Sequence, residues 1–199
     1  MMRVDIVLSG IGGQGILTLA AILGTAAILD KYDVRVSEVH GMAQRGGAVT
    51  CHVKIGDKIS SPLVMEGSAD MIVALEASET LRALHYLKPK GTIVTNSLEH
   101  PPPLSMIKGL KYPSLNEIIE EAKKLTDEIY VVDAYNVARS LGSLQTINMV
   151  ILGSMWATGK LLLSRGSIVK AIERSFREPT ATINLKAFEE GIKLVKKLL

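Results

Sequence analysis

Apolar positions near the start of the chain follow the pattern of a β–α–β unit. Residues 4–9 are mostly apolar, which is typical of a parallel strand buried on both faces. Residues 16–30 are apolar on nearly all sides of a helix, so we expect this helix to be covered on both sides. Residues 34–39 predict a second strand. A strand, a glycine-rich turn, a helix and a strand follow one another here at about the usual length.

Residues 48–55 alternate strictly between apolar and polar side chains, which predicts a half-exposed strand. His52 lies on the polar side of this strand, where a histidine is more often exposed than functional. Gly56-Asp57-Lys58 predicts a turn into a short return strand that ends at Pro62. We therefore expect a hairpin here, at an edge of the sheet.

The middle of the chain alternates between apolar runs and helical patterns. Three runs predict strands, at residues 71–75, 92–95 and 130–132. One helix is predicted from Ser78 to about Leu87. A second, opened by the capping box Ser114-Leu115-Asn116-Glu117, is predicted to end at about Leu125.

From Ala134 onward the pattern is helical, with a final helix at roughly residues 184–198. Strands that alternate with helices imply a three-layer α/β/α fold with a mostly parallel, Rossmann-like sheet, an edge hairpin and a helical C-terminal region. The sequence thus predicts one domain over residues 1–199, with a helical tail at about residues 134–199. This tail could pack on the sheet or reach out to a partner.

Composition limits the chemistry that the chain can carry alone. Of its 199 residues, 47% are hydrophobic, which is enough for a substantial core. The one cysteine, Cys51, excludes an internal disulfide, and it excludes an iron–sulfur cluster held by this chain alone because such clusters generally need four thiolates. We expect Cys51 to fill the core rather than act as a nucleophile, and we expect a cytoplasmic protein.

Charge and hydropathy disfavour nucleic-acid and membrane partners. The net charge is +3, the basic residues are dispersed, and aromatic residues make up only 4% of the chain. The longest uncharged apolar stretch, Ile16 to Leu29, is shorter than the roughly 20 residues that a bilayer requires. A signal peptide is not expected either, because only Arg3 precedes this stretch as a positive residue and glycines lie directly before it.

The glycine-rich turn is the first candidate binding site. Gly10, Gly12 and Gly15 satisfy G-x-G-x-x-G, with Gly13 and Gln14 between them, and the turn lies between a predicted strand and a predicted helix. Glycines allow phosphates to approach backbone N–H groups, and the helix N-terminus adds about half a positive charge. The alternative is a tight strand–helix crossing that binds no ligand.

Glu38 is the second candidate, near the end of the second predicted strand. A ribose-binding acid lies at this place in a dinucleotide site, although Glu38 comes a little late after Gly15. An ordinary strand-end carboxylate is an equally good explanation.

The loop from His40 to Gly47 is the third candidate. If the first two strands are adjacent and parallel, their C-terminal loops lie side by side, so this loop and the glycine turn share one rim of the sheet. Arg45 could hold a phosphate or carboxylate through two hydrogen bonds, and Gly46 and Gly47 leave backbone N–H groups accessible. The other donors around this crevice are Gln14, His40 and Gln44. A locally bonded loop and a protein–protein contact surface remain as alternatives.

No other pattern in the sequence predicts catalysis or a metal site. Glu76 and Asp133 end further strands and could touch a ligand, but capping or loop bonding is the more common role. The sequence contains no His/Cys/Asp/Glu cluster with zinc spacing, no G-x-S-x-G motif and no Walker lysine. We therefore assign no catalytic residue and no metal ligand to this chain.

The two glycine-rich segments together resemble a known family. Gly10-Ile11-Gly12-Gly13-Gln14-Gly15 and the segment from Glu38 to Gly47 are similar to the gamma-type domain of pyruvate and related 2-oxoacid:ferredoxin oxidoreductases, above all to its indolepyruvate-specific branch. Residues 148–153 and 184–188 agree as well, so the resemblance covers essentially the whole chain.

This resemblance implies a role inside a larger enzyme. Such an enzyme converts an arylpyruvate and coenzyme A to an arylacetyl-CoA and carbon dioxide, and passes electrons to ferredoxin. In this family the large partner subunit holds thiamine diphosphate with magnesium and the [4Fe-4S] clusters. The present sequence has one cysteine and lacks the G-D-G…N motif that binds the thiamine diphosphate, since Gly56-Asp57-Lys58 has no second glycine. The resemblance thus implies a subunit that is inactive alone.

Two other functions stay open at the level of sequence. The glycine turn also fits a free-standing NAD(P)- or flavin-binding protein. The paired loops also fit a purely structural subunit that only contacts a partner. By analogy with the family, the glycine-rich rim would help to bind coenzyme A or close the active site at the subunit interface.

Overall fold

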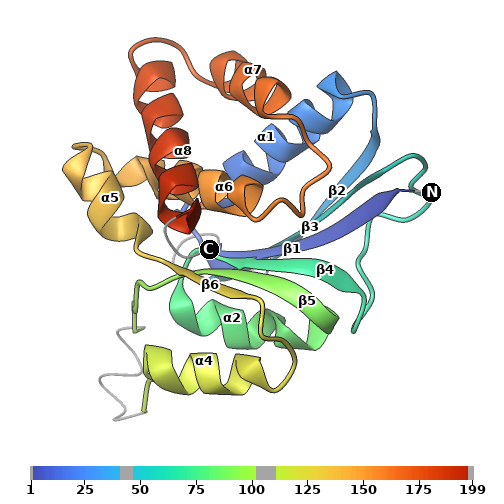
Figure 1. Cartoon of the computed structure of the whole chain (residues 1–199), viewed down its shortest axis with the longest axis vertical. Helices are drawn as coiled ribbons and strands as arrows, with labels where there is room; N and C mark the ends of the chain where they lie inside the picture. The colour runs from blue at the N-terminus through green and yellow to red at the C-terminus, as the bar shows by residue number, and fades with distance from the viewer. Residues whose placement is uncertain (1, 41–46, 102–110, 197–199) are drawn as a thin grey trace.

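The computed structural model describes residues 2–40, 47–101 and 111–196. A six-stranded sheet lies at its centre, in the order β2-β3-β1-β4-β5-β6 (Figure 1). The strands are β1 (Arg3–Ile11), β2 (Asp33–His40), β3 (Ala48–Gly56), β4 (Ala69–Ala74), β5 (Leu87–Asn96) and β6 (Ile129–Val132).

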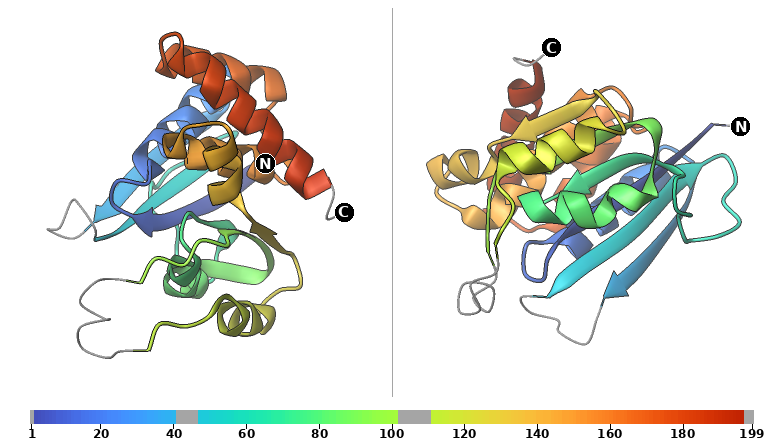
Figure 2. Two further views of the ribbon diagram at one scale, coloured as in Figure 1. Left: turned by 90° about the vertical axis from the view of Figure 1, so that its left-hand side faces the viewer. Right: turned by 90° about the horizontal axis from the view of Figure 1, so that it is seen from below.

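Helices cover both faces of this sheet, as the views in Figures 1 and 2 show. One face carries α1 (Ile16–Leu29), α5 (Ala134–Ser140), α6 (Ile147–Ala157), α7 (Arg165–Ser175) and α8 (Thr180–Lys196). The other face carries α2 (Ala77–Ala83) and α4 (Leu115–Lys123). Short 3-10 turns lie at Leu84–Tyr86 and Leu144–Thr146. The predicted three-layer α/β/α fold is confirmed.

Strand β3 gives the sheet its mixed character. It pairs antiparallel with β1 on one side and with β2 on the other, whereas β1, β4, β5 and β6 pair in parallel. The edge hairpin is therefore β2–β3. The predicted return strand before Pro62 is wrong, since residues 57–62 form no strand.

The polar face of β3 is covered rather than exposed, which corrects a second prediction. His52 is only 2% exposed, and its Nδ1 accepts a hydrogen bond of 3.0 Å from the Val64 amide. Lys54 donates to the Leu63 carbonyl at 3.1 Å and lies 3.4 Å from the Asp5 carboxylate. The segment after Gly56 thus lies over this face and buries it, which the alternation of residue types could not reveal.

The boundary between α2 and β5 also differs from the prediction. The buried Glu76 caps α2 by accepting from the Glu79 amide, so the helix begins before Ser78. A 3-10 turn then leads directly into β5 at Leu87, and the strand continues through the Lys88-Pro89-Lys90-Gly91 segment.

The helical C-terminal region packs on the sheet. Helices α6 and α8 approach each other closely at Gly153 and Gly191. A Cβ atom on either glycine would lie 2.0 Å from a backbone oxygen of the other helix, that of Phe188 or Val150. Ser154 spans the same crossing, because its hydroxyl donates to the Gly191 carbonyl at 3.1 Å. Within the described ranges, no helix has both the length and the apolarity needed to cross a bilayer.

Candidate functional site

The turn between β1 and α1 has a backbone that requires glycine. Gly13 and Gly15 have φ angles of 105° and 81°, in the left-handed region that other residues rarely adopt. A Cβ on Gly10 would lie 2.7 Å from Ile16 Cδ1 and 2.8 Å from Gln14 Oε1. The turn therefore presents backbone rather than side chains to its surroundings.

The turn and the second glycine-rich segment meet at one rim. The Gly12 amide donates a hydrogen bond of 2.8 Å to the Gly47 carbonyl. Our reason for expecting this was wrong, because β3 lies between β1 and β2. The segments still meet, since both strands run antiparallel to β3 and so end at the same edge.

The structure describes only some of the donors predicted around this rim. Gln14 uses its Oε1 to accept from the Ile11 amide at 2.8 Å, which leaves its NH₂ group as a donor for a ligand. His40 ends β2. The predicted ligand contacts of Gln44, Arg45 and Gly46 lie outside the described residues.

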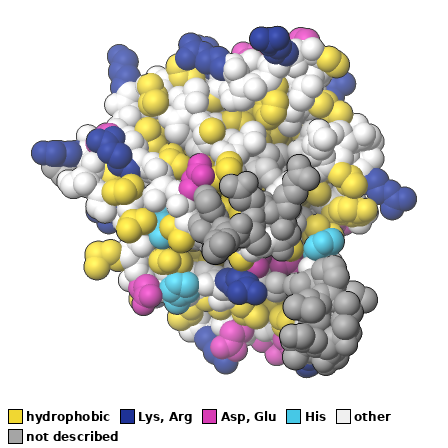
Figure 3. All heavy atoms as spheres, turned by 180° about the vertical axis from the view of Figure 1, so that it is seen from behind, with side chains coloured by type: hydrophobic (Ala, Val, Ile, Leu, Met, Phe, Trp, Pro, Cys, Tyr) yellow, Lys and Arg dark blue, Asp and Glu magenta, His cyan; other side chains and the backbone are white. Residues whose placement is uncertain are grey.

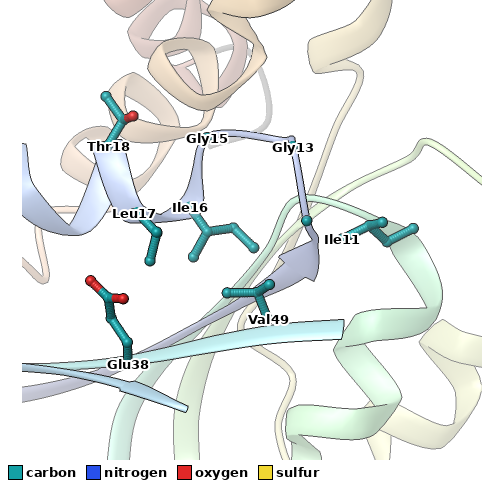
Figure 4. A pocket seen from close by; sticks show the side chains of 9 residues that line it. Ile11, Gly13, Gly15, Ile16, Leu17, Thr18, Glu38 and Val49 are labelled. Atoms are coloured by element: carbon teal, nitrogen blue, oxygen red, sulfur yellow. The ribbon is translucent and has the colours of Figure 1, made fainter. Parts of the chain in front are cut away.

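A pocket of about 470 Å³ lies beside the turn, between α1 and the β2–β3 hairpin. Figure 4 shows the Glu38 carboxylate pointing from β2 toward the first turn of α1. The residues that line it are Ile11, Gly12, Gly13, Gly15, Ile16, Leu17, Thr18, Glu38 and Val49. A carboxylate here can accept hydrogen bonds from ligand hydroxyls but repels a nearby anion.

The start of α1 is open to a ligand. Its N-cap is Gly15, which offers no capping side chain, and its first turn carries no acidic residue. The partial positive charge of the helix end is therefore not neutralised by a side chain of that turn. Backbone N–H groups at such an end suit phosphate or carboxylate oxygens.

The remaining candidates have structural roles. Asp133 caps α5 by accepting from the Asn136 amide at 3.1 Å, as Glu76 caps α2. Cys51 is fully buried in the core, as predicted. Burial and, next, the charge of Glu38 raise the pKa of its thiol to about 12, which makes it a poor nucleophile.

Sequence reasoning missed a residue that contacts the turn from the other side. Asn148 in α6 donates from Nδ2 to the Gly15 carbonyl at 3.1 Å, across 133 positions of the chain. A Cβ on Gly15 would lie 2.4 Å from this nitrogen, so glycine and asparagine fit each other. The signal available was an asparagine at the start of the otherwise apolar α6 segment.

The part of the chain that the structure describes does not fit a metal ion or an iron–sulfur cluster. Over the described ranges, no group of three His, Cys, Asp or Glu side chains is placed to hold a metal ion. The single thiol is buried. We therefore derive no catalytic step through thiamine diphosphate or a cluster in this subunit.

Fold and site together define an α/β protein with a mixed sheet. A glycine-rich rim of two segments lies where β1 and β2 end. The chain belongs to the pyruvate ferredoxin/flavodoxin oxidoreductase family, which its residues 5–194 match. The family predicted from the paired glycine-rich segments is thereby confirmed.

Curated relatives match the chain over nearly its full length. The indolepyruvate oxidoreductase subunit IorB of Thermococcus kodakarensis is 39% identical, with 100% of this chain and 99% of the relative covered. The IorB subunit of Archaeoglobus fulgidus is 37% identical over 96% of this chain and 94% of its own. The common gamma subunit of the pyruvate/ketoisovalerate oxidoreductases of Thermococcus kodakarensis is 30% identical, at coverages of 94% and 95%.

Solved structures show the same fold. The gamma subunit of a keto/oxoacid ferredoxin oxidoreductase from Geobacter sulfurreducens has a TM-score of 0.71 and 25% identity, covering 98% of this chain and 99% of that chain. A 2-oxoglutarate:ferredoxin oxidoreductase from Magnetococcus marinus, solved with coenzyme A bound, has a TM-score of 0.74. At 18% identity it shows the fold alone, with 100% of this chain matching 32% of that one.

Proposed function

We propose that the chain is the small, cluster-free subunit of a 2-oxoacid:ferredoxin oxidoreductase that acts on indolepyruvate or a related arylpyruvate. Relatives that match it end to end carry the indolepyruvate oxidoreductase name. A larger partner supplies thiamine diphosphate, magnesium and the [4Fe-4S] clusters, and the complex passes electrons to ferredoxin in the cytoplasm. The present chain completes the assembly as a single domain over residues 1–199.

At the site itself, one hydrogen bond is the main support for the proposal. The hydrogen bond from Gly12 to Gly47 joins the two family motifs into one rim. A chain with a single, buried thiol cannot use this rim for electron transfer through a cluster of its own. We infer that the rim serves the partner's active site, by contacting coenzyme A or by closing the subunit interface.

Exposed apolar side chains on α1 and β2 support a partner contact. Leu17, Val36 and Val39 are 46%, 40% and 47% exposed, and they lie on α1 and β2 on either side of Glu38. On the face drawn in Figure 3, hydrophobic side chains form several small groups between charged ones.

Reconstitution tests the role of the chain. The full chain, a candidate large partner subunit, and the co-expressed complex are each assayed for ferredoxin reduction that depends on indolepyruvate and coenzyme A. We expect turnover only from the complex. Turnover by the large subunit alone at the rate of the complex would contradict the proposal. Tight NADH binding by the isolated chain, measured by fluorescence, would instead favour a free-standing nucleotide-binding protein.

Substitution of the rim tests the contribution to coenzyme A binding. In the reconstituted complex, Gln44→Ala and Arg45→Ala are expected to raise the KM for coenzyme A by about tenfold, the loss of one charge-assisted hydrogen bond. Glu121→Gln on α4, on the other face of the sheet, is the control and should change nothing. Unchanged KM and unchanged turnover in both rim variants would show that the rim does not bind coenzyme A.

A further inference from the structure

A second pocket lies on the other flank of the glycine turn, against α6 and α8. Its volume is about 390 Å³. The residues lining it are Gly13, Gln14, Gly15, Thr18, Ser143, Leu144, Gln145, Thr146, Ile147, Asn148, Phe176, Thr180, Ile183 and Asn184. Hydroxyl and amide groups dominate the polar part, and this set contains no charged side chain. The pocket beside Glu38 shares Gly13, Gly15 and Thr18 with it but carries a carboxylate.

Asn148 in this pocket has a hydrogen-bond acceptor without a partner. The residue is 4% exposed, and its Nδ2 donates to the Gly15 carbonyl. That acceptor fixes the orientation of the amide, so Oδ1 is the atom left over. Oδ1 is buried and finds no donor among the described residues. Leaving a buried acceptor unsatisfied costs about 1–3 kcal/mol, so a donor from outside the chain would stabilise this site.

Three helices begin at the same pocket. It is lined by N-terminal residues of α1, α6 and α8, and the first turns of these helices carry no acidic residue. The N-caps Gly15 and Thr146 make no side-chain capping bond. The N–H groups of Ile147, Ala181 and Ile183 already donate to backbone carbonyls. The Glu178 carboxylate, just before α8, accepts from the Thr182 hydroxyl in the first turn of that helix. The start of α1 is therefore the helix end that most favours an anion here.

The two flanks of the turn therefore differ in the charge that they favour. On one flank Glu38 repels an anion; on the other, the start of α1 attracts it and no acidic side chain lines the pocket. We propose that the pocket at Asn148 is a second ligand site, which binds a small phosphate ester bearing a hydroxyl or amide donor. The phosphate lies at the start of α1, and the donor bonds Asn148 Oδ1. This site does not depend on the function proposed above.

Titration of the ¹⁵N-labelled full chain tests the site, with NMR shifts as the readout. Glycerol 3-phosphate is compared with inorganic phosphate, because the two share the anion and differ in the hydroxyl donors. We expect saturable shifts at Gly13, Gly15 and the Asn148 side chain. Glycerol 3-phosphate should bind about fivefold more tightly, the effect of one additional hydrogen bond.

Two variants and one control separate the contribution of the anion from that of the donor contact. Gln145→Glu adds a negative charge in the pocket at a helix start that tolerates it, and should weaken both ligands at least about fivefold. Asn116→Asp adds the same charge at the start of α4, away from the pocket, and should leave binding unchanged. Asn148→Leu should abolish the preference for glycerol 3-phosphate over phosphate.

Several results would overturn the proposal. If neither ligand causes saturable shifts, the pocket binds no phosphate ester and water alone satisfies Asn148 Oδ1. If Gln145→Glu and Asn116→Asp weaken ligand binding equally, the effect comes from the overall charge of the protein and not from this pocket. An unchanged preference for glycerol 3-phosphate in Asn148→Leu would show that Asn148 makes no donor contact. If that variant fails to fold, the comparison of Gln145→Glu with Asn116→Asp still locates the anion.

Discussion

The two faces of the sheet bury different kinds of side chain. The face under α1, α6 and α8 is apolar and contains most of the core, from Ile6 and Leu8 to Phe188. The face under α2 has a smaller apolar cluster around Val7 and Ile72. Buried ionisable groups, among them Glu79, lie beside that smaller cluster. Close packing holds one face together, whereas hydrogen bonds and ion pairs organise the other.

Glu79 illustrates the polar face. It is 4% exposed, accepts from the Ser9 hydroxyl at 3.1 Å and pairs with Arg82 at 2.9 Å. Burial raises the pKa of its carboxyl, against the opposing effects of Arg82 and Ser9. Glu76 nearby accepts from the His100 amide and the Tyr112 hydroxyl, so it ties down both ends of the segment that follows β5.

The largest expected effect tests close packing on the apolar face. Gly191→Ala should lower the free energy of unfolding by about 3 kcal/mol or more, because its Cβ would lie 2.0 Å from the Val150 carbonyl oxygen, a backbone atom. Gly24→Ala is the matched control, since its nearest neighbour is Val36 Cγ2 at 3.6 Å. It should be neutral or stabilise α1 by about 0.5–1 kcal/mol. Urea unfolding measures both, and equal effects would contradict this account of the α6–α8 crossing.

A smaller effect tests whether polar contacts matter on the apolar face too. Asp30 follows α1 and accepts from the Ser164 amide at 2.7 Å and from the Ser167 hydroxyl at 2.5 Å, at the start of α7. Asp30→Ala should cost about 1–2 kcal/mol in urea unfolding. Glu121→Ala on exposed α4 is the control. A cost for Asp30→Ala no larger than that of the control would show that α7 docks through apolar contacts alone.

The pH dependence of the two carboxyls should have opposite signs. Burial would raise the pKa of Asp30, but hydrogen bonds from Ser167 and Ser164 outweigh it and lower that pKa. Its contribution is therefore present above its unfolded pKa and lost as the pH falls. The raised pKa of Glu79 acts the other way, so stability from that group falls as the pH rises.

Unfolding from about pH 3 to pH 7 measures this contrast. The destabilisation caused by Asp30→Asn should shrink toward the acidic end. Glu79→Gln should gain stability relative to the parent chain toward the neutral end. Parallel curves for the two variants would contradict the difference between the two faces.

The smallest effect is expected at the surface of α8. Lys193 lies 2.6 Å from Glu190, with both side chains largely exposed to solvent. Lys193→Ala should change the free energy of unfolding by less than about 0.5 kcal/mol, because exposed ion pairs gain little over hydration. A change above about 1 kcal/mol would mean that charge contributes to the apolar face as well.

Sequence patterns predicted what depends on neighbouring residues. The apolar run at residues 4–9, the glycines of the turn and the capping box at Ser114 each specify a local conformation, and the structure has a strand, a turn and a helix there. Glu38 lies beside the turn as well, but through a strand pairing that differs from the predicted one.

Contacts between distant segments could not be predicted in the same way. The insertion of β3 between β1 and β2 depends on which strands pair, and several pairings satisfy the same apolar pattern. The burial of His52 depends on a separate segment that covers it. The contact of Asn148 with Gly15 joins residues that no spacing rule relates.

The position of β2 at the end of the sheet has a consequence for the life of the subunit before assembly. A terminal strand presents unpaired N–H and C=O groups along one side, and these can template the addition of a strand from another chain. β2 is eight residues long, and Val36 and Val39 are exposed on it. Arg35, paired with Asp33, places charge on the same strand and discourages such growth. Charge on β2 therefore protects the unassembled subunit from association at this edge. High salt should make the isolated subunit aggregate faster.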